Sequence, residues 1–309
     1  FDRFGVTIDL YNKNTSDLLY YAPLPNISGY TGQYKNVGAI NNKGLEISLN
    51  ADVIRTSKFQ WTSDFNIGFN RNRVTELYGG KPELKGLKRL EEGRDMDEWY
   101  LREWAGVDPA NGSPLWYTTD ENGKRTTTDS YNKADRVYCG SAAPKFTGGW
   151  MNSFSYKGFT LTANFDFVYG NLLYNQSREL LDSDGAYADY NSMKLKSGWK
   201  RWEKEGDIAT HPKAINGGNK KTNKSSSRYL EKGNYFSLRN LSLGYSIPEK
   251  LCGKLGLQRV NVSCSADNLF TLTPFSGVSP QLSDSSTDGY AGTIYPLSRR
   301  IVFGLNVSF

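Results

Sequence analysis

The sequence has no long hydrophobic run, and this absence limits how the chain could meet a membrane. No stretch approaches the roughly 18–20 apolar residues that a membrane-spanning helix requires. Mean hydropathy is -0.60 and only 38% of the 309 residues are hydrophobic, although 14% are aromatic. Helical spans are therefore excluded. A membrane β-barrel remains compatible with the composition, because it carries its apolar residues at alternate positions of each strand.

Cysteine and histidine are scarce, which removes several classes of site. Cys139, Cys252 and Cys264 are too few and too scattered for a disulfide framework or a zinc site. The one histidine, His211, has no neighbouring triad or ligand pattern, and we interpret it as a loop residue. No glycine-rich phosphate loop occurs at a strand-to-helix junction. The sequence therefore predicts no catalytic residue, no metal site and no cofactor.

Two pairs of aspartates resemble fragments of a calcium-binding loop, namely Asp182 with Asp184 and Asp284 with Asp288. Neither pair has the ninth- and twelfth-position partners of a complete EF-hand loop. We therefore interpret all four as residues that form turns.

The net charge of +6 is not focused enough to predict a nucleic-acid partner. The densest basic stretch, residues 194–224, is rich in glycine and serine and is interrupted by Glu203, Glu205 and Asp207. A solvated loop is the simpler interpretation of such a stretch.

What the sequence has in abundance is alternation of apolar and polar residues with a period of two, where helical periodicity fails. In one example, Leu241, Leu243 and Tyr245 alternate with Asn240 and Ser242. The same pattern recurs along the chain, at residues 4–10, 44–54, 59–70, 158–170, 234–247, 259–268 and 299–309.

These predicted strands are longer than those of most soluble sheets. Several run to about ten residues or more, against a usual five or six, and about ten is the length that a tilted strand needs to cross a bilayer. Asp52, Asp64 and Asp166 lie in mid-strand on the polar face and suit a wet lumen better than a dry core. A soluble sandwich would instead turn the apolar face inward, and the alternation by itself is compatible with both.

The connections favour the barrel, because short and long ones alternate. The short ones are residues 55–58, 157–158 and 247–256, and the long ones lie near 11–43, 70–98, 119–145, 170–233 and 271–298. The alternation includes a weaker pair of strands, 98–106 and 113–119, which brings the count to about ten. Outer-membrane barrels have short periplasmic turns and long extracellular loops. We therefore predict one domain, residues 1–309, with extracellular long loops and a periplasmic C-terminus.

Aromatic residues in the long loops are candidates for contact with a substrate or partner. Aromatic faces stack on sugar rings and grip peptide side chains, and they also anchor partner proteins. Some of them could instead belong to the aromatic belt at a membrane interface. The candidates are Trp116, Tyr117, Tyr174, Tyr187, Tyr190, Trp199 and Trp202.

Six segments and the last residues, GLNVSF, stand in an order that resembles one family. They are NVGAINNKGLEISLN (36–50), FQWTSDFNIGFNRNRV (59–74), AGVDPANGSPLWY (105–117), SAAPKFTGGWMNSFSYKGFTLTANFDFVYGN (141–171), SRYLEKGNYFSLRNLSLGYSIP (227–248) and NLFTLTPFSGVSP (268–280). Together they resemble the C-terminal barrel region of SusC/RagA-family TonB-dependent transporters from the outer membrane of Bacteroidetes.

The resemblance implies an all-β fold, part of a transmembrane antiparallel barrel of 22 strands whose plug domain lies outside this chain. It implies energised import of glycans or oligopeptides rather than an enzyme. The implied partners are a SusD-like surface lipoprotein that acts as a lid, the TonB complex through an N-terminal part, and outer-membrane lipid. The terminal Phe309 fits the true end of such a protein, whereas Phe1 does not fit its true start.

Two other classes of function stay open on the sequence. One is a secreted soluble β-protein that binds carbohydrate through exposed aromatic residues. The other is a β-rich glycoside hydrolase, for which the sequence offers no positive signal.

Overall fold

One antiparallel sheet of eight long strands dominates the computed structural model. The model describes residues 2–187, 189–190, 193–254, 256–282, 289–292 and 294–309. In spatial order the strands are β1 (Phe4–Thr15), β4 (Ala39–Arg55), β5 (Phe59–Glu76), β13 (Phe146–Tyr156), β14 (Phe159–Tyr169), β17 (Tyr235–Ser246), β18 (Arg259–Leu272) and β20 (Arg300–Ser308). Each strand pairs with its neighbours in this order, so the sheet is a simple meander. The nearly all-β fold predicted from the alternation is confirmed.

The register places the apolar residues of adjacent strands on the same face. Ile8 pairs with Ile47, which pairs with Ile67. At the other side of the sheet Leu161 pairs with Leu243, Leu243 with Cys264, and Cys264 with Phe303. Directly opposed residues point to the same side of a sheet. One apolar face therefore runs across all eight strands, made of the same alternate residues that the sequence pattern predicts.

Two hydrogen-bonding side chains interrupt this apolar face, and each is paired with an indole. Trp61 Nε1 donates to Asn152 Oδ1 at 3.0 Å, and Trp150 Nε1 donates to Ser63 Oγ at 2.9 Å. A polar group without a partner is costly wherever water is excluded. Each pair gives an indole N–H its acceptor and a side-chain oxygen its donor within the face itself.

The predicted strands at 98–106 and 113–119 exist, but their place in the large sheet was wrong. They are β8 (Glu98–Arg102), β9 (Trp104–Val107) and β10 (Pro114–Thr119), which pair within two small sheets. Strands of four to six residues are too short to cross a bilayer, and Trp99 and Leu101 of β8 are buried among the loops. Eight strands rather than about ten therefore form the large sheet, and the alternation of short and long connections holds without this pair.

The remaining elements are short and lie in the connections. The strands are β2 (Leu19–Pro23), β3 (Gly32–Asn36), β6 (Glu83–Lys85), β7 (Lys88–Leu90), β11 (Arg125–Thr128), β12 (Arg136–Ser141), β15 (Leu172–Asn175), β16 (Leu230–Lys232) and β19 (Tyr290–Ala291). The helices are α1 (Ser177–Leu181) and α2 (Glu249–Lys254), with 3-10 turns at Asn26–Ser28, Tyr78–Gly80 and Ser227–Tyr229. No helix in the described part of the chain is long and apolar enough to span a membrane.

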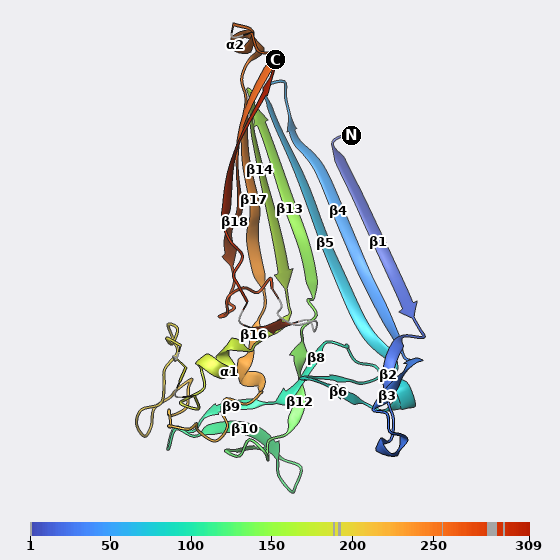
Figure 1. Cartoon of the computed structure of the whole chain (residues 1–309), viewed down its shortest axis with the longest axis vertical. Helices are drawn as coiled ribbons and strands as arrows, with labels where there is room; N and C mark the ends of the chain where they lie inside the picture. The colour runs from blue at the N-terminus through green and yellow to red at the C-terminus, as the bar shows by residue number, and fades with distance from the viewer. Residues whose placement is uncertain (1, 188, 191–192, 255, 283–288, 293) are drawn as a thin grey trace.

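The two kinds of connection lie at opposite ends of the long strands (Figure 1). The short turns and α2 share one end with the C-terminus, and the long connections gather at the other end. The tightest turn, Lys157-Gly158, has φ of 46° and 87° at its two residues. Two positive φ angles are typical of the hairpin turn that matches the twist of the flanking strands. The chain thus builds a wall with a folded mass at one end.

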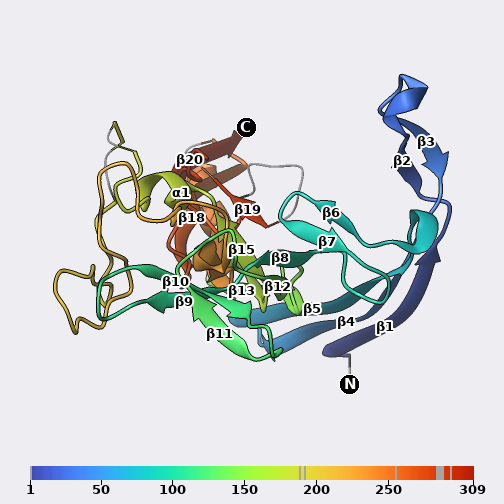
Figure 2. The same cartoon turned by 90° about the horizontal axis from the view of Figure 1, so that it is seen from below.

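The large sheet bends into an open arc, with β6, β7 and β8 on its concave side (Figure 2). The backbone N–H of Met96, in that loop region, donates to Asn72 Oδ1 at 3.4 Å. Asn72 alternates along β5 with Arg71 and Arg73, and it therefore belongs to the polar face. The polar face is concave and the continuous apolar face is convex.

Candidate functional site

The long connections pack together into one body with its own aromatic core. Trp99, Leu101, Ala142, Tyr174 and Tyr229 form a buried cluster that draws on two long connections. Tyr290, from a third, packs edge-to-face on Trp99 with ring centroids 5.2 Å apart. Trp99 Nε1 also donates to the backbone oxygen of Leu172 at 3.0 Å. The loop body is therefore a folded platform and not a set of separate solvated loops.

A buried charge network holds the longest connection in place. Asp182 and Asp184, just after α1, have fully buried carboxylates. Arg178 Nη2 lies 2.8 Å from Asp182, and Arg201 Nη1 lies 2.6 Å from Asp184. Arg228 contacts both carboxylates. Since a buried carboxylate is stable only with partners of opposite charge, the three arginines decide the conformation of this connection.

His211 lies in the longest connection, as interpreted from the sequence, but it also belongs to the buried network. Its ring is 1% exposed, and Nε2 lies 3.0 Å from Asp182 Oδ2. The interpretation of Asp182 and Asp184 as turn residues was likewise incomplete, because both carboxylates serve buried ion pairs. Asp284 and Asp288 lie outside the described residues. Among the residues described, no group of three or more His, Cys, Asp or Glu side chains is placed to hold a metal ion.

The pKa of Asp182 reflects its partners more than its burial. Burial alone raises the pKa of this carboxyl. The hydrogen bond with His211 and the charges of Arg228, His211 and Arg178 outweigh burial and lower the pKa to about 2. Asp182 is therefore ionised at every physiological pH, which fits a structural anion better than a group that exchanges protons.

The concave face of the wall carries polar rows that cross several strands. Asn50 Nδ2 donates to Asp64 at 2.7 Å. Further along the arc, Asp267 accepts from Asn240 at 2.8 Å and from Arg300 Nη2 at 2.7 Å. Asp64 was predicted on a wet face from the sequence. The cross-strand partners of these carboxylates were missed, because they come together only through pairing of β4 with β5 and of β18 with β17 and β20.

A hollow of about 880 Å³ lies where the wall meets the loop body. Tyr11, Gly44 and Asn70 line it from three adjacent strands, and Ser141 and Pro144 line it from the connection before β13. The hydroxyl of Tyr11 donates to Asn70 Oδ1 at 3.0 Å. A Cβ on Gly44 would lie 2.2 Å from the Tyr11 ring, so only glycine leaves room for this ring against the wall. The hollow also has apolar and charged side chains in its lining, Leu172, Asp95 and Lys145 among them, and it therefore offers contacts of all three kinds.

The structure separates the seven predicted contact residues into two groups. Trp116, Tyr174 and Trp202 are buried, at 0%, 1% and 8% exposure, and this corrects their prediction as contact residues. Their rings pack inside the loop body, where Trp202 Nε1 donates to the backbone oxygen of Pro109 at 2.9 Å. These three rings are buried by residues that are distant in the sequence. The neighbouring sequence therefore gives no sign that would distinguish them from exposed loop aromatics.

The other four keep some accessible surface. Tyr190 is 54% exposed and its ring lies 5.5 Å from that of half-buried Tyr187. Half-buried Tyr117 and Trp199 are each covered on one side by a guanidinium, from Arg125 at 3.7 Å and from Arg178 at 4.5 Å. Among the seven predicted residues, the pair Tyr187–Tyr190 is therefore the most accessible to a ligand.

Known proteins resemble this chain along nearly its whole length. The comparison with family models gives no match. Two TonB-dependent receptors of Formosa agariphila, P39 and P3, are 29% and 30% identical over 99% and 100% of the chain. The TonB-dependent receptor SusC of Bacteroides thetaiotaomicron is 23% identical over 98% of it. The chain spans only 34%, 32% and 30% of the lengths of these three relatives.

Solved structures give the same result in three dimensions. The structure of the RagAB peptide transporter matches with a TM-score of 0.85 at 28% identity, covering 100% of this chain and 34% of that one. The RagAB peptide importer in the 'open-open' state also matches with a TM-score of 0.85, at 27% identity, covering 100% of this chain and 33% of that one. The eight-stranded arc is thus part of a known transporter fold.

Neutralising Asp184 should loosen the loop body. Asp184→Asn leaves buried Arg228 and half-buried Arg201 without their shared carboxylate, and breaking a buried ion pair costs about 3–5 kcal/mol. We expect faster proteolysis and faster hydrogen exchange within residues 170–233. Asp129→Asn is the matched control, since Asp129 is exposed and pairs with exposed Lys220; it should change neither rate appreciably. Equal effects of the two variants would contradict a structural role for the buried network.

Acid should weaken the loop body through Asp182. Its pKa is lowered on folding from an ordinary 3.8 to about 2. A lowered folded-state pKa means that the stabilisation, of the order of 2 kcal/mol, is complete above about pH 4 and is lost as the pH falls towards about 2. Hydrogen exchange of residues 170–233, corrected for its intrinsic pH dependence, measures this loss. In Asp182→Asn the change across this pH window should be smaller.

Proposed function

We propose that this chain, whose predicted resemblance to SusC/RagA-like TonB-dependent receptors is confirmed, forms part of the wall of an outer-membrane importer. The chain spans about a third of its relatives, and the activity proposed is therefore that of a larger protein. Within that protein the chain supplies eight wall strands and a loop platform.

The continuous convex apolar face is the observation that carries this proposal. On β5 it extends from Phe59 to Phe69, ten residue steps that measure roughly 33 Å along the strand. A barrel strand tilted by about 40° would cover roughly 25 Å of this along the membrane normal, which matches the apolar band of outer-membrane barrels.

The same face argues against a secreted soluble protein. Leu10, Phe303 and Leu305 are 80%, 79% and 70% exposed. Exposed apolar surface that extends across a whole sheet promotes aggregation in water, whereas lipid covers it at no cost.

The placement of the connections supports an orientation for the wall. Short turns lie at the end that carries the C-terminus, and long connections lie at the other end (Figure 1). By the rule for outer-membrane barrels, the long connections are extracellular and the C-terminus is periplasmic. The whole of residues 1–309 then belongs to the barrel domain, with the loop body facing the outside.

The proposed cargo is a glycan or an oligopeptide, held between the loop body and a SusD-like lipoprotein lid. The matched solved structures are those of a peptide transporter and a peptide importer, whereas the predicted family resemblance favours glycans. Transport would be energised through the TonB complex, which acts on a part of the receptor outside this chain. The accessible Tyr187–Tyr190 pair and the polar concave wall suit either cargo.

Membrane assembly tests the outward face. Leu243 is on the convex face, and its neighbour Ser242 is on the concave face. Leu243→Arg should reduce assembly, because an arginine on the lipid face costs about 2–4 kcal/mol near the bilayer midplane. Ser242→Arg should assemble normally. The measurement is the fraction of the whole receptor in the outer membrane that migrates faster in SDS before boiling, and the opposite ranking would reverse the assignment of the faces.

Uptake by cells tests the import function and its cargo. Cells with the whole receptor should accumulate labelled oligosaccharides or labelled peptides only while the TonB complex is intact. The double variant Tyr187→Ala with Tyr190→Ala should lower cargo affinity by about tenfold, since each stacking aromatic contributes about 0.5–1.5 kcal/mol. Tyr117→Ala is the control: because a guanidinium already covers one side of this ring, its removal should change cargo affinity less. Accumulation that is independent of TonB would reject energised import.

A further inference from the structure

The apolar convex face ends abruptly on three adjacent strands, and a cluster of cations follows it. Leu10, Leu45 and Phe69 lie side by side as the last apolar row. The next row on the same face is Asn12, Lys43 and Arg71, and the one after it is Asn14, Asn41 and Arg73. The change from apolar to basic therefore occurs at one level across β1, β4 and β5, at the end where the long connections begin.

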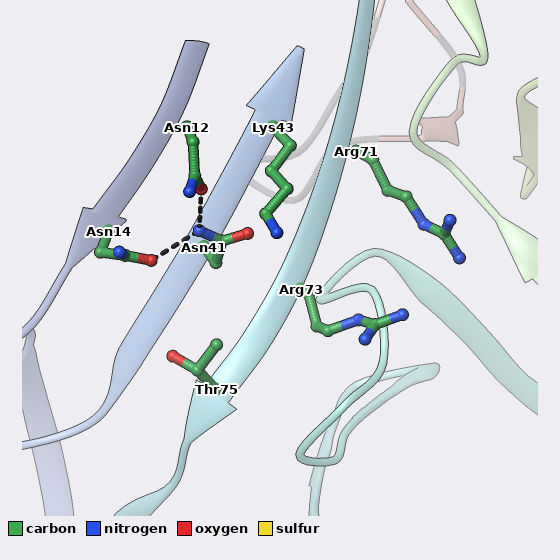
Figure 3. Close-up of a pocket in the computed structure, with 7 residues that line it drawn as sticks. All are labelled: Asn12, Asn14, Asn41, Lys43, Arg71, Arg73 and Thr75. Carbon is green, nitrogen blue, oxygen red and sulfur yellow. Dashed lines mark hydrogen bonds between the residues drawn. The ribbon is translucent and has the colours of Figure 1, made fainter.

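These polar rows line a hollow of about 540 Å³ (Figure 3). The side chains come from three neighbouring strands, and the lining contains no carboxylate. Its residues are Asn12, Asn14, Asn41, Lys43, Arg71, Arg73 and Thr75.

The amides in the hollow are arranged as hydrogen-bond donors. Asn41 Nδ2 donates to Asn12 Oδ1 at 2.6 Å and to Asn14 Oδ1 at 2.5 Å. Both acceptor oxygens are therefore engaged by Asn41, which leaves the two NH₂ groups of Asn12 and Asn14 available. Together with an ammonium and two guanidinium groups, the hollow presents donors almost exclusively, and such a set fits an anion with several oxygens.

The three cations form no ion pair within the part of the chain that the structure describes, although Asp95 and Glu98 line an adjacent hollow together with Arg71 and Arg73. No ion pair or side-chain hydrogen bond joins Lys43, Arg71 or Arg73 to another residue in the described ranges, and all three are exposed. By contrast, Arg178, Arg201 and Arg228 of the loop body are all paired with carboxylates. An unpaired cluster beside an apolar surface differs from the ion pairs that hold the loops.

We propose that this cluster binds the phosphate of an anionic lipid head group in the leaflet that faces the long connections. The proposal rests on the proposed membrane wall, because the cluster then sits at the height where acyl chains give way to head groups. The acyl chains would cover the row Leu10, Leu45 and Phe69 while Lys43, Arg71 and Arg73 hold the phosphate. Basic clusters at this level attract anionic lipids. A free phosphate ion would gain the charges but not the adjoining apolar contact, which favours lipid as the source.

The experiment measures lipid retention by the purified whole receptor in native mass spectrometry. The probes are phosphatidylglycerol and phosphatidylcholine with identical acyl chains. Wild type should retain phosphatidylglycerol at least about tenfold better. The triple variant Lys43→Gln, Arg71→Gln, Arg73→Gln should lose most of this preference. A control variant with the same change in charge in exposed loop positions, Lys194→Gln, Lys204→Gln, Lys224→Gln, should keep it.

Each outcome bears on one proposal. An embedded wild-type receptor with equal retention of both lipids overturns the lipid site and leaves the importer intact. Displacement of phosphatidylglycerol by millimolar inorganic phosphate would assign the cluster to soluble anions and overturn the lipid source. Failure of Leu243→Arg to impair assembly, by contrast, would question the membrane wall itself.

A second measurement on the wild-type receptor covers the case in which the triple variant does not assemble. The preference for phosphatidylglycerol should fall as the salt concentration rises, because salt screens charge pairs. A preference that does not depend on salt would overturn the site.

Discussion

The cross-strand register is the constraint on which the rest of this structure depends. Because side chains alternate along a strand, a shift of one residue would move a whole apolar set to the other face. The pairing of Ile8 with Ile47, and of Leu243 with Cys264, keeps every strand of the arc in phase. The result is a wall with one apolar and one polar side. Without that phase there would be neither a continuous apolar face nor a continuous polar face.

The loop body depends on a different kind of interaction. Its aromatic cluster around Trp99 joins separate connections, and its buried carboxylates fix the longest one. Charge pairs of this kind specify a conformation, because a misplaced loop would leave Asp182 or Arg228 buried without a partner. A platform built in this way can present Tyr187 and Tyr190 in a defined position, as a binding surface requires.

Wall and loop body meet at two boundaries with distinct chemistry. On the concave side Tyr11 and Asn70 contribute to a hollow that polar, apolar and charged side chains line together, among them Asp95 and Lys145. On the convex side the rows beyond Phe69 carry Lys43, Arg71 and Arg73, which form no ion pair with any residue that the structure describes. The same two strands, β4 and β5, therefore turn Gly44 and Asn70 towards the proposed cargo path and Lys43 and Arg71 towards the proposed lipid. A period of two allows this, since alternate residues never compete for the same side.

The sequence by itself determined where most strands of the large sheet lie and which residues share each face, because alternation is a pattern of neighbouring residues. Several strands extend beyond the predicted ranges, as β4 and β5 do. It also determined the family resemblance. Only the tertiary structure decided that β8 and β10 leave the large sheet, that Trp116, Tyr174 and Trp202 are buried, and that His211 joins Asp182. These outcomes rest on contacts between residues far apart in the chain, 29 positions for His211 and Asp182 and 73 for Trp99 and Leu172. No local sequence pattern predicts such contacts, since they form only when separate connections pack together.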